Sequence, residues 1–364
     1  MSFSAWDEFW WNNITGPRTA VTRIAEAVLE GRSVVLSIPE NLAWKASMRG
    51  AVHNFSRDRL NNDDIVIETV DAAYDIPDSA EPGRFILSRF ASGPVSRGYR
   101  EKSRVSVQDY IRAKNVIRNR VVWVKGLNSK NADLWLKFCR GFANKSLKDG
   151  VFVLEIEGEL RENDCRPLTL VDFGDFISSY DVQLFSSLVL DEQDKYPDTW
   201  KKYIAALAAS VCGINAETAD ELIETVDFTA RSAAEAIRDI SGLPYSELEH
   251  MVWSAQVQVL FPLIEMERVS IVAKWREIIQ QALDENYVAQ YGERITDACD
   301  AELGTLCSMM KWRTEEGLYV LYIPDEKERL RISFLHNCRN KIAHASCCST
   351  YDIAILLGGD GIVR

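Results

Sequence analysis

The feature that most constrains this chain is a change in hydrophobic pattern along its length. Short continuous apolar runs alternate with helical segments up to about residue 192, and from Tyr196 onward the pattern is helical almost throughout. Continuous apolar runs are typical of parallel strands buried on both faces, and their alternation with helices predicts βαβ units. The sequence therefore predicts a parallel α/β domain over residues 1–192, followed by helical structure.

Within this domain, four apolar runs predict four strands of the sheet, and a fifth strand is expected within 181–190. The four runs are 33–38, 65–70, 121–124 and 151–156. Helical patterns predict helices over residues 1–31 and near 41–54, 107–119 and 133–142. The segment 76–99 is rich in Gly, Pro and Ser and predicts a loop.

The helical part divides further at Gly242-Leu243-Pro244, a combination that interrupts helices. Two amphipathic segments before it, 199–212 and 216–240, predict a helical connector over residues 193–242. A helical C-terminal domain is then expected over 243–364. Pro262 is expected to kink or restart a long helix there, because proline lacks the backbone N–H that a helix interior needs.

Composition limits the partners of the chain. Its net charge of −12 argues against broad binding to nucleic acid and leaves room only for a small local site. No apolar run approaches the length of a membrane span, and no signal peptide is evident, so we expect a cytoplasmic protein without a membrane partner. The eight cysteines contain no CxxC pair and are expected to be reduced thiols. We expect no cofactor and no metal, since the cluster Cys338, His344, Cys347 and Cys348 lacks a second ligand pair.

A strand, a tight loop and a helix at 33–54 lie where a nucleotide-binding P-loop would be. Phosphate binding there needs glycines, a lysine and a Ser or Thr. With Lys45 aligned to the lysine, the glycine positions hold Pro39 and Trp44, and the hydroxyl position holds Ala46. The third strand ends in Lys125-Gly126 in place of an acidic magnesium ligand.

Residues 20–190, by their order of strands and helices, nevertheless resemble the AAA-like branch of P-loop NTPases, with the catalytic motifs lost. The resemblance implies a degenerate nucleotide site at Pro39, Trp44 and Lys45; an unrelated α/β domain is the alternative. Both interpretations predict little or no ATP hydrolysis. Trp6, Trp10 and Trp11 are expected either to form a docking patch for a protein partner or to pack under this domain. The alternating Glu155, Glu157 and Glu159 favour a solvated strand edge over a pair of catalytic carboxylates.

The C-terminal stretch Arg339-Asn340-Lys341-Ile342-Ala343-His344 carries the best candidate for chemistry. On an ideal helix, Phe334, Leu335, Cys338, Ile342 and Ala345 would form a buried stripe, with Arg339, Asn340 and His344 on the opposite side. His336 and Lys341 are further candidates for substrate contacts. Arginine can stabilise charge on a phosphate, and histidine can transfer protons near neutral pH.

The spacing alone is weak evidence, because Arg331 and His336 repeat it eight residues upstream. The hexapeptide in its helical context, however, resembles the Arg-x4–6-His signature of the HEPN superfamily over about residues 243–364. The resemblance implies metal-independent RNA cleavage with 2′,3′-cyclic phosphate and 5′-OH products. It assigns His344 as acid/base, Arg339 as phosphate anchor, and Asn340 as the residue that positions His344 or the substrate.

The same resemblance implies a composite site between two copies of the motif in a homodimer. One helix places Arg339 and His344 about 140° apart, which is compatible with such an arrangement. In bacterial defence or toxin-type systems, domains of this kind act as RNA-cutting effectors. The alternative is a non-catalytic adaptor, in which both the NTPase-like and the HEPN-like domains bind partners.

Overall fold

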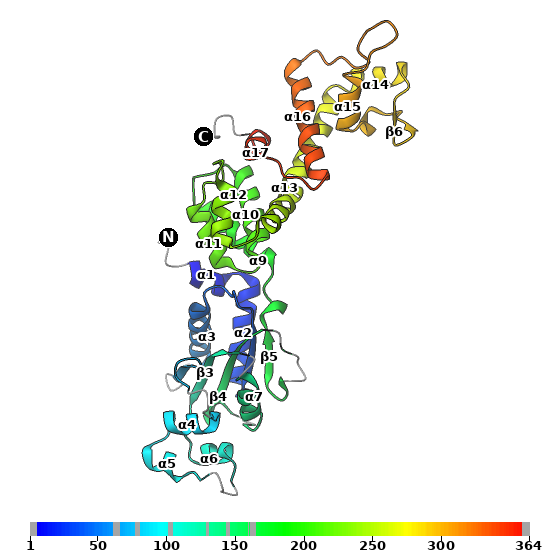
Figure 1. The fold of residues 1–364 in the computed structure, drawn as a ribbon. Coiled ribbons are helices and arrows are strands. Elements are labelled where there is room, and N and C mark those ends of the chain that lie inside the picture. Colours follow the sequence, from blue (N-terminus) through cyan, green and yellow to red (C-terminus); the bar gives the residue numbers. More distant parts are fainter. Residues whose placement is uncertain are drawn as a thin grey trace. The chain divides into compact units, whose positions relative to one another are not determined.

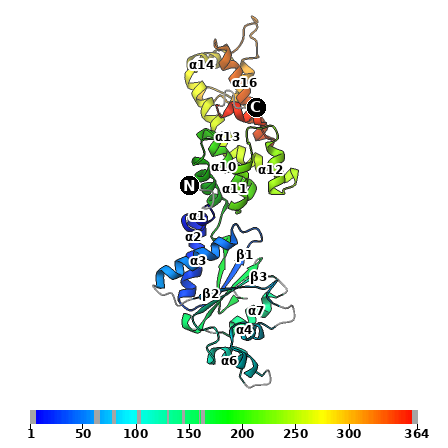
Figure 2. The ribbon, with the colours of Figure 1, turned by 90° about the vertical axis from the view of Figure 1, so that its left-hand side faces the viewer.

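The computed structural model describes residues 6–60, 66–76, 81–100, 105–128, 131–142, 146–158, 160 and 165–358. The described chain forms two compact units (Figures 1 and 2). The first contains residues 1–181 together with 214–217, and the second contains 182–213 and 218–364. Each unit is described by itself below.

The first unit is built on a five-stranded parallel sheet in the order β2-β3-β4-β1-β5. The strands are β1 (Val34–Ile38), β2 (Val66–Asp71), β3 (Arg120–Leu127), β4 (Val151–Glu157) and β5 (Thr169–Asp172). Every residue of β1 is buried, as its continuous apolar sequence predicts for a strand covered on both faces. The predicted parallel α/β domain is therefore confirmed.

Helices cover both faces of this sheet (Figure 2). The helices of this unit are α1 (Trp6–Asn13), α2 (Thr15–Leu29), α3 (Lys45–Leu60), α4 (Pro82–Phe90), α5 (Gly93–Gly98), α6 (Val107–Ala113) and α7 (Ala132–Arg140). Helix α2 contacts β1 and β5 and packs with α1 and α3. Phe85, Trp135 and Phe138 form an apolar cluster with Val122 and Leu154 of the sheet.

Two expectations for this unit are wrong. The segment 76–99 is not simply a loop, because a proline in the first turn starts both α4 and α5, and α4 buries Phe85 and Ile86. The fifth strand is not within 181–190 but is the short β5, while α9 (Ser179–Asp191) covers the predicted range. The buried residues of α9 recur at helical spacing: Val182, Phe185, Ser186, Val189 and Leu190.

The tryptophans near the N-terminus pack inside the first unit. Trp10 and Trp11 are fully buried, and Trp11 makes an edge-to-face contact with Phe173 at 6.0 Å between ring centroids. Only Trp6 keeps partial exposure. Of the two alternatives, packing is confirmed for Trp10 and Trp11, so these residues offer no docking patch.

The second unit is helical apart from one small hairpin. It contains most of α9, then α10 (Asp198–Cys212), most of α11 (Ala216–Thr225), α12 (Ala233–Ser241), α13 (Tyr245–Lys274), α14 (Arg276–Glu285), β6 (Ala289–Gln290), β7 (Glu293–Arg294), α15 (Leu303–Met309), α16 (Glu326–Ala343) and α17 (Thr350–Leu356). The long α13 contacts α10, α16 and α17 (Figure 1). The helices expected as a connector thus pack with the C-terminal helices in one unit. In the part of the chain that the structure describes, no helix is long and apolar enough to cross a membrane.

Of the two outcomes expected at Pro262, a kink or a restart, the restart is wrong. Helix α13 continues through it from Tyr245 to Lys274. Pro262 and Gln258, one turn earlier, are both exposed, so water can hydrate the carbonyl that the proline leaves without a partner. A proline on the solvent side of a helix is therefore tolerated here.

Candidate active site

Helix α16 forms because its sequence satisfies both its first turn and its buried face. The Asp325 side chain accepts hydrogen bonds from the backbone N–H groups of Lys327 and Glu328. Its buried stripe consists of Ile332, Leu335, Cys338 and Ile342. This packing leaves a polar face that carries His336, Arg339 and Asn340, as the sequence pattern predicted.

These three residues line one cleft of about 300 Å³. The β6–β7 hairpin and α15 form its other walls, with residues that include Tyr291, Glu302, Gly304, Thr305 and Trp312. The Asn340 amide nitrogen lies 3.0 Å from Nε2 of His336. Because an amide nitrogen only donates, this contact requires a neutral imidazole with its lone pair on Nε2.

The environment of His336 favours that neutral ring. Burial lowers its pKa from the ordinary 6.5, and the positive charges of Lys311 and Arg339 lower it further. A neutral imidazole at pH 7 can accept a proton from a substrate hydroxyl, which is the role of a general base.

Arg339 is held by an ion pair inside the cleft. Its Nη2 lies 3.3 Å from Oε2 of Glu302, and the Tyr291 hydroxyl donates to the same oxygen at 3.3 Å. The two charged side chains are 28% and 39% exposed. Such a solvent-accessible pair contributes at most about 1 kcal/mol, so an incoming phosphate can displace the carboxylate.

The structure does not bring His344 into this cleft. Helix α16 ends at Ala343, and His344 is an exposed cap residue with non-helical ψ. The expectation that His344 and Ala345 continue the helical faces is therefore wrong. Ala345 has a φ of 55° and is exposed, because the chain turns out of the helix there.

Lys341 also lies outside the cleft. Its Nζ is 2.8 Å from Oδ2 of Asp352 in α17, and this hydrogen bond raises the pKa of the lysine. The structure thus combines His336, Arg339 and Asn340, and it leaves His344 and Lys341 apart.

Several residues of the cleft were missed in the sequence, chiefly Tyr291, Glu302 and Trp312. The only local signal is the pair Tyr291-Gly292, which forms the two-residue turn of the hairpin with φ values of 53° and 87°. Glu302 gives no pattern of its own, because its role depends on the packing of α15 against α16.

At the predicted degenerate nucleotide site, Trp44 and Lys45 are hydrogen-bonded to groups of the same chain. Residues 39–44 join β1 to α3, and Lys45 is the first residue of α3, as a P-loop arrangement requires. The Trp44 N–H donates to the Glu217 carboxylate at 2.9 Å. Lys45 Nζ donates to the Glu40 carbonyl and to Glu157, both at 3.0 Å.

A carboxylate of the same chain thus accepts the hydrogen bond of a backbone N–H just before α3. In a P-loop, the backbone N–H groups at this place point at phosphate. Pro39 supplies no N–H at all, and Trp44 has a φ of 42° in place of a glycine. Glu157 neutralises the lysine that would otherwise bind phosphate.

For Glu155, the expectation of a solvated strand edge is wrong. Glu155 is 1% exposed on β4, which lies between β3 and β1, and Arg49 Nη1 binds its oxygens at 2.7 and 3.0 Å. Burial raises the pKa of this carboxyl in spite of Arg49. Glu159 lies outside the described residues.

No site for a metal emerges from the donor groups of the described chain. No group of three or more His, Cys, Asp or Glu side chains is arranged to hold an ion among those residues. The Sγ of Cys348 donates to the Cys338 carbonyl at 3.8 Å, and that of Cys347 to the Glu249 carbonyl at 3.3 Å.

No protein-family model matches the chain, and no curated protein matches it. Among solved structures it is similar to the Orc1 protein of Aeropyrum pernix in complex with DNA, with 11% identity over 96% of this chain and 94% of that one and a TM-score of 0.36. It is also similar to Cdc6p from Pyrobaculum aerophilum, with 11% identity over 95% and 93% and a TM-score of 0.33. What the structure shows is a parallel α/β unit with the strand order β2-β3-β4-β1-β5 and a second, helical unit.

Proposed function

We propose that this protein is a metal-independent endoribonuclease of the HEPN type, with its reaction centred on the cleft of His336, Arg339 and Asn340. The observation that carries the proposal is the placement of a neutral imidazole, a guanidinium and an amide in one cleft of about 300 Å³. A site of this size suits one phosphodiester with its neighbouring ribose, and the net charge of −12 agrees with local recognition.

The chemistry is an internal displacement on RNA. His336 takes the proton of a ribose 2′-OH after that hydroxyl replaces the Asn340 amide at Nε2. The 2′-oxygen attacks the adjacent phosphorus, and Arg339 leaves Glu302 to stabilise the negative charge on the phosphoryl oxygens. The bond to the 5′-oxygen breaks, and a general acid protonates that oxygen, which leaves a 2′,3′-cyclic phosphate and a 5′-OH.

His344 is assigned the role of the general acid. In a homodimer, His344 of one copy would act in the cleft of the other copy. Its exposed position at the end of α16, outside its own cleft, leaves it accessible to a second copy. The resemblance to HEPN domains supports this arrangement, since composite sites are what it implies. Lys341, which is exposed near His344 in sequence, is assigned to the RNA backbone.

The experiment uses the purified full-length protein with RNA in excess EDTA. We expect cleavage by the wild type and a loss of at least 100-fold in His336→Ala and His344→Ala, which remove acid–base groups, and in Arg339→Ala, which removes the group that stabilises the phosphoryl charge. The matched control is His53→Ala, which removes a histidine of α3 in the other unit and should retain activity. Cleavage that persists in both Arg339→Ala and His336→Ala would contradict the proposal.

The setting proposed for this activity is a bacterial defence or toxin-type system in the cytoplasm. There the AAA-like unit would bind a protein partner or sense a signal, and the helical unit would cut RNA. The support is the resemblance of the two domains, together with the carboxylates of the same chain that bind Trp44 and Lys45 at the predicted nucleotide site.

The second candidate is a non-catalytic adaptor, and one observation favours it. The three cationic groups that would bind phosphate, Arg339, Lys341 and Lys45, are each paired with a carboxylate of the same chain. Absence of cleavage by the wild type, with folded and dimeric protein, would support this candidate over the ribonuclease.

A further inference from the structure

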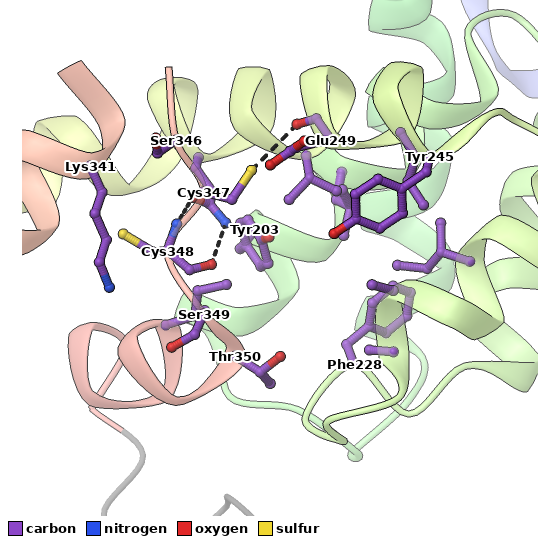
Figure 3. A pocket seen from close by; sticks show the side chains of 18 residues that line it. Tyr203, Phe228, Tyr245, Glu249, Lys341, Ser346, Cys347, Cys348, Ser349 and Thr350 are labelled. Atoms are coloured by element: carbon purple, nitrogen blue, oxygen red, sulfur yellow. Dashed lines mark hydrogen bonds between the residues drawn. The ribbon is translucent and has the colours of Figure 1, made fainter. Parts of the chain in front are cut away.

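A second pocket in the helical unit lies apart from the cleft of His336. It has a volume of about 420 Å³ and is enclosed by α10, α12, α13 and the segment 346–350 that follows α16 (Figure 3). Figure 3 shows Tyr245 and Phe228 on one side, and Lys341, Ser346 and Cys348 on the other. The volume falls within the range typical of small-molecule sites, about 300–1,000 Å³.

The pocket is lined mainly by apolar and aromatic side chains. These include Tyr203, Phe228 and Tyr245, with aliphatic side chains such as Ile237 and Leu248 between them in the lining. An aromatic or aliphatic body would remove this apolar surface from water, which favours binding.

Hydrogen bonds between side chains and backbone groups hold one wall of the pocket, the segment that contains Cys347 and Cys348, in place. The fully buried Gln256 accepts from the Cys348 N–H at 2.7 Å and donates to the Cys348 carbonyl at 3.0 Å. The Cys347 thiol donates to the Glu249 carbonyl at 3.3 Å (Figure 3). The segment is thus held without a ligand, and the pocket is preformed, which reduces the entropic cost of binding.

The charges around the pocket decide which ligand fits. Two charged side chains line it, Lys341 and Glu249, and the lysine is engaged by Asp352 at 2.8 Å. Within the described part of the chain, no side chain pairs with the Glu249 carboxylate. Burial, together with the charge of Glu249, raises the pKa of the Cys347 thiol to about 11, so this wall adds no negative charge at neutral pH. The pocket therefore favours a ligand that carries a positive charge next to an apolar group.

We propose that this pocket binds a small organic cation, an amine attached to an aromatic or aliphatic body. The body lies between Tyr203, Phe228 and Tyr245, and the ammonium group faces Glu249. The aromatic rings add cation–π attraction to the ion pair.

Two matched probes test the proposal on the full chain by isothermal titration calorimetry. Naphthylmethylamine is a cation at neutral pH, and naphthylacetate is an anion with the same ring system. We expect the amine to bind with a Kd below about 1 mM, which is ordinary for a ligand of this size, and the acetate at least about fivefold more weakly.

Two variants locate the site. Glu249→Gln should weaken the amine about fivefold and remove most of the difference between the probes, as expected for a partly exposed ion pair. Its control, Glu247→Gln, removes an exposed carboxylate of the same helix outside the pocket and should change nothing. Ala234→Trp should fill the pocket and abolish binding of the amine, whereas Ala273→Trp, on an exposed part of α13, should not.

Equal binding of the two probes, no binding of the amine at 1 mM or below, or undiminished binding to Ala234→Trp with native circular dichroism would each overturn the proposal. None of these results bears on RNA cleavage, so the pocket and the ribonuclease are tested separately.

Discussion

The end of α16 offers a sharp test of how the chain positions His344. The helix closes with the hydrogen bonds of a Schellman motif: Ser346 N–H donates to the Lys341 carbonyl at 2.8 Å, and Ala345 N–H to the Ile342 carbonyl at 3.2 Å. This motif places Ala345 in the left-handed region, with a φ of 55°. Glycine is usual at that position, because a Cβ is disfavoured there.

The change Ala345→Gly should therefore stabilise the helical unit. A left-handed conformation costs an L-residue about 1–2 kcal/mol, and the greater flexibility of glycine in the unfolded chain costs about 0.5–1 kcal/mol. The net gain is about 0.5–1 kcal/mol. The matched control is Ala343→Gly, an exposed position inside the last helical turn, where glycine should destabilise by about 0.5–1 kcal/mol.

Thermal and urea unfolding of both variants measure these free energies. For a unit of this size, the two substitutions should move the melting temperature in opposite directions by about 1–4 °C. If Ala345→Gly destabilises as much as Ala343→Gly does, the helix continues through His344. The assignment of His344 as a cap residue outside the cleft would then be refuted.

Three further predictions concern the two candidate sites. The acid limb of the pH–rate profile for RNA cleavage should have its midpoint below pH 6.5. Burial and the charges of Lys311 and Arg339 lower the pKa of His336, so the ring stays neutral until the pH falls through the lowered pKa. A midpoint at or above pH 6.5 would contradict the role of His336 as general base. Glu302→Gln should free Arg339 and tighten RNA binding about two- to fivefold in fluorescence anisotropy at low salt, and unchanged affinity would show that the ion pair does not compete with phosphate. The wild type should show no magnesium-dependent ATP hydrolysis, and Lys45→Ala should leave that result unchanged, whereas hydrolysis lost in the variant would show an active site.

Local patterns were enough to predict the sheet but not all of its elements. The run 151–156 is buried throughout, and a continuous run of this kind can be recognised as a strand from the sequence. The short β5 cannot, because four residues give too little pattern to distinguish it from a loop. The apolar residues within 181–190 led to the prediction of a strand. Their spacing, however, is helical, and the structure has them in α9.

For the candidate site, one helix face could be predicted and its surroundings could not. The buried stripe of α16 indicated that Arg339 and Asn340 share a polar face, and the structure joins them in one cleft. The position of His344 depends on where the helix ends, and Ala345 gives no glycine signal for that end. Glu302 and Tyr291 reach the cleft from separate segments, so only tertiary packing brings them to Arg339.

The measurement that tests the ribonuclease most directly compares a short RNA with its 2′-O-methylated counterpart, both in EDTA, with analysis of the product ends. Because the 2′-OH is the proposed nucleophile and no metal takes part, the account predicts cleavage of the RNA to 2′,3′-cyclic phosphate and 5′-OH ends. It also predicts that the methylated strand stays intact. Cleavage of the methylated strand, or cleavage that EDTA abolishes, would contradict the account.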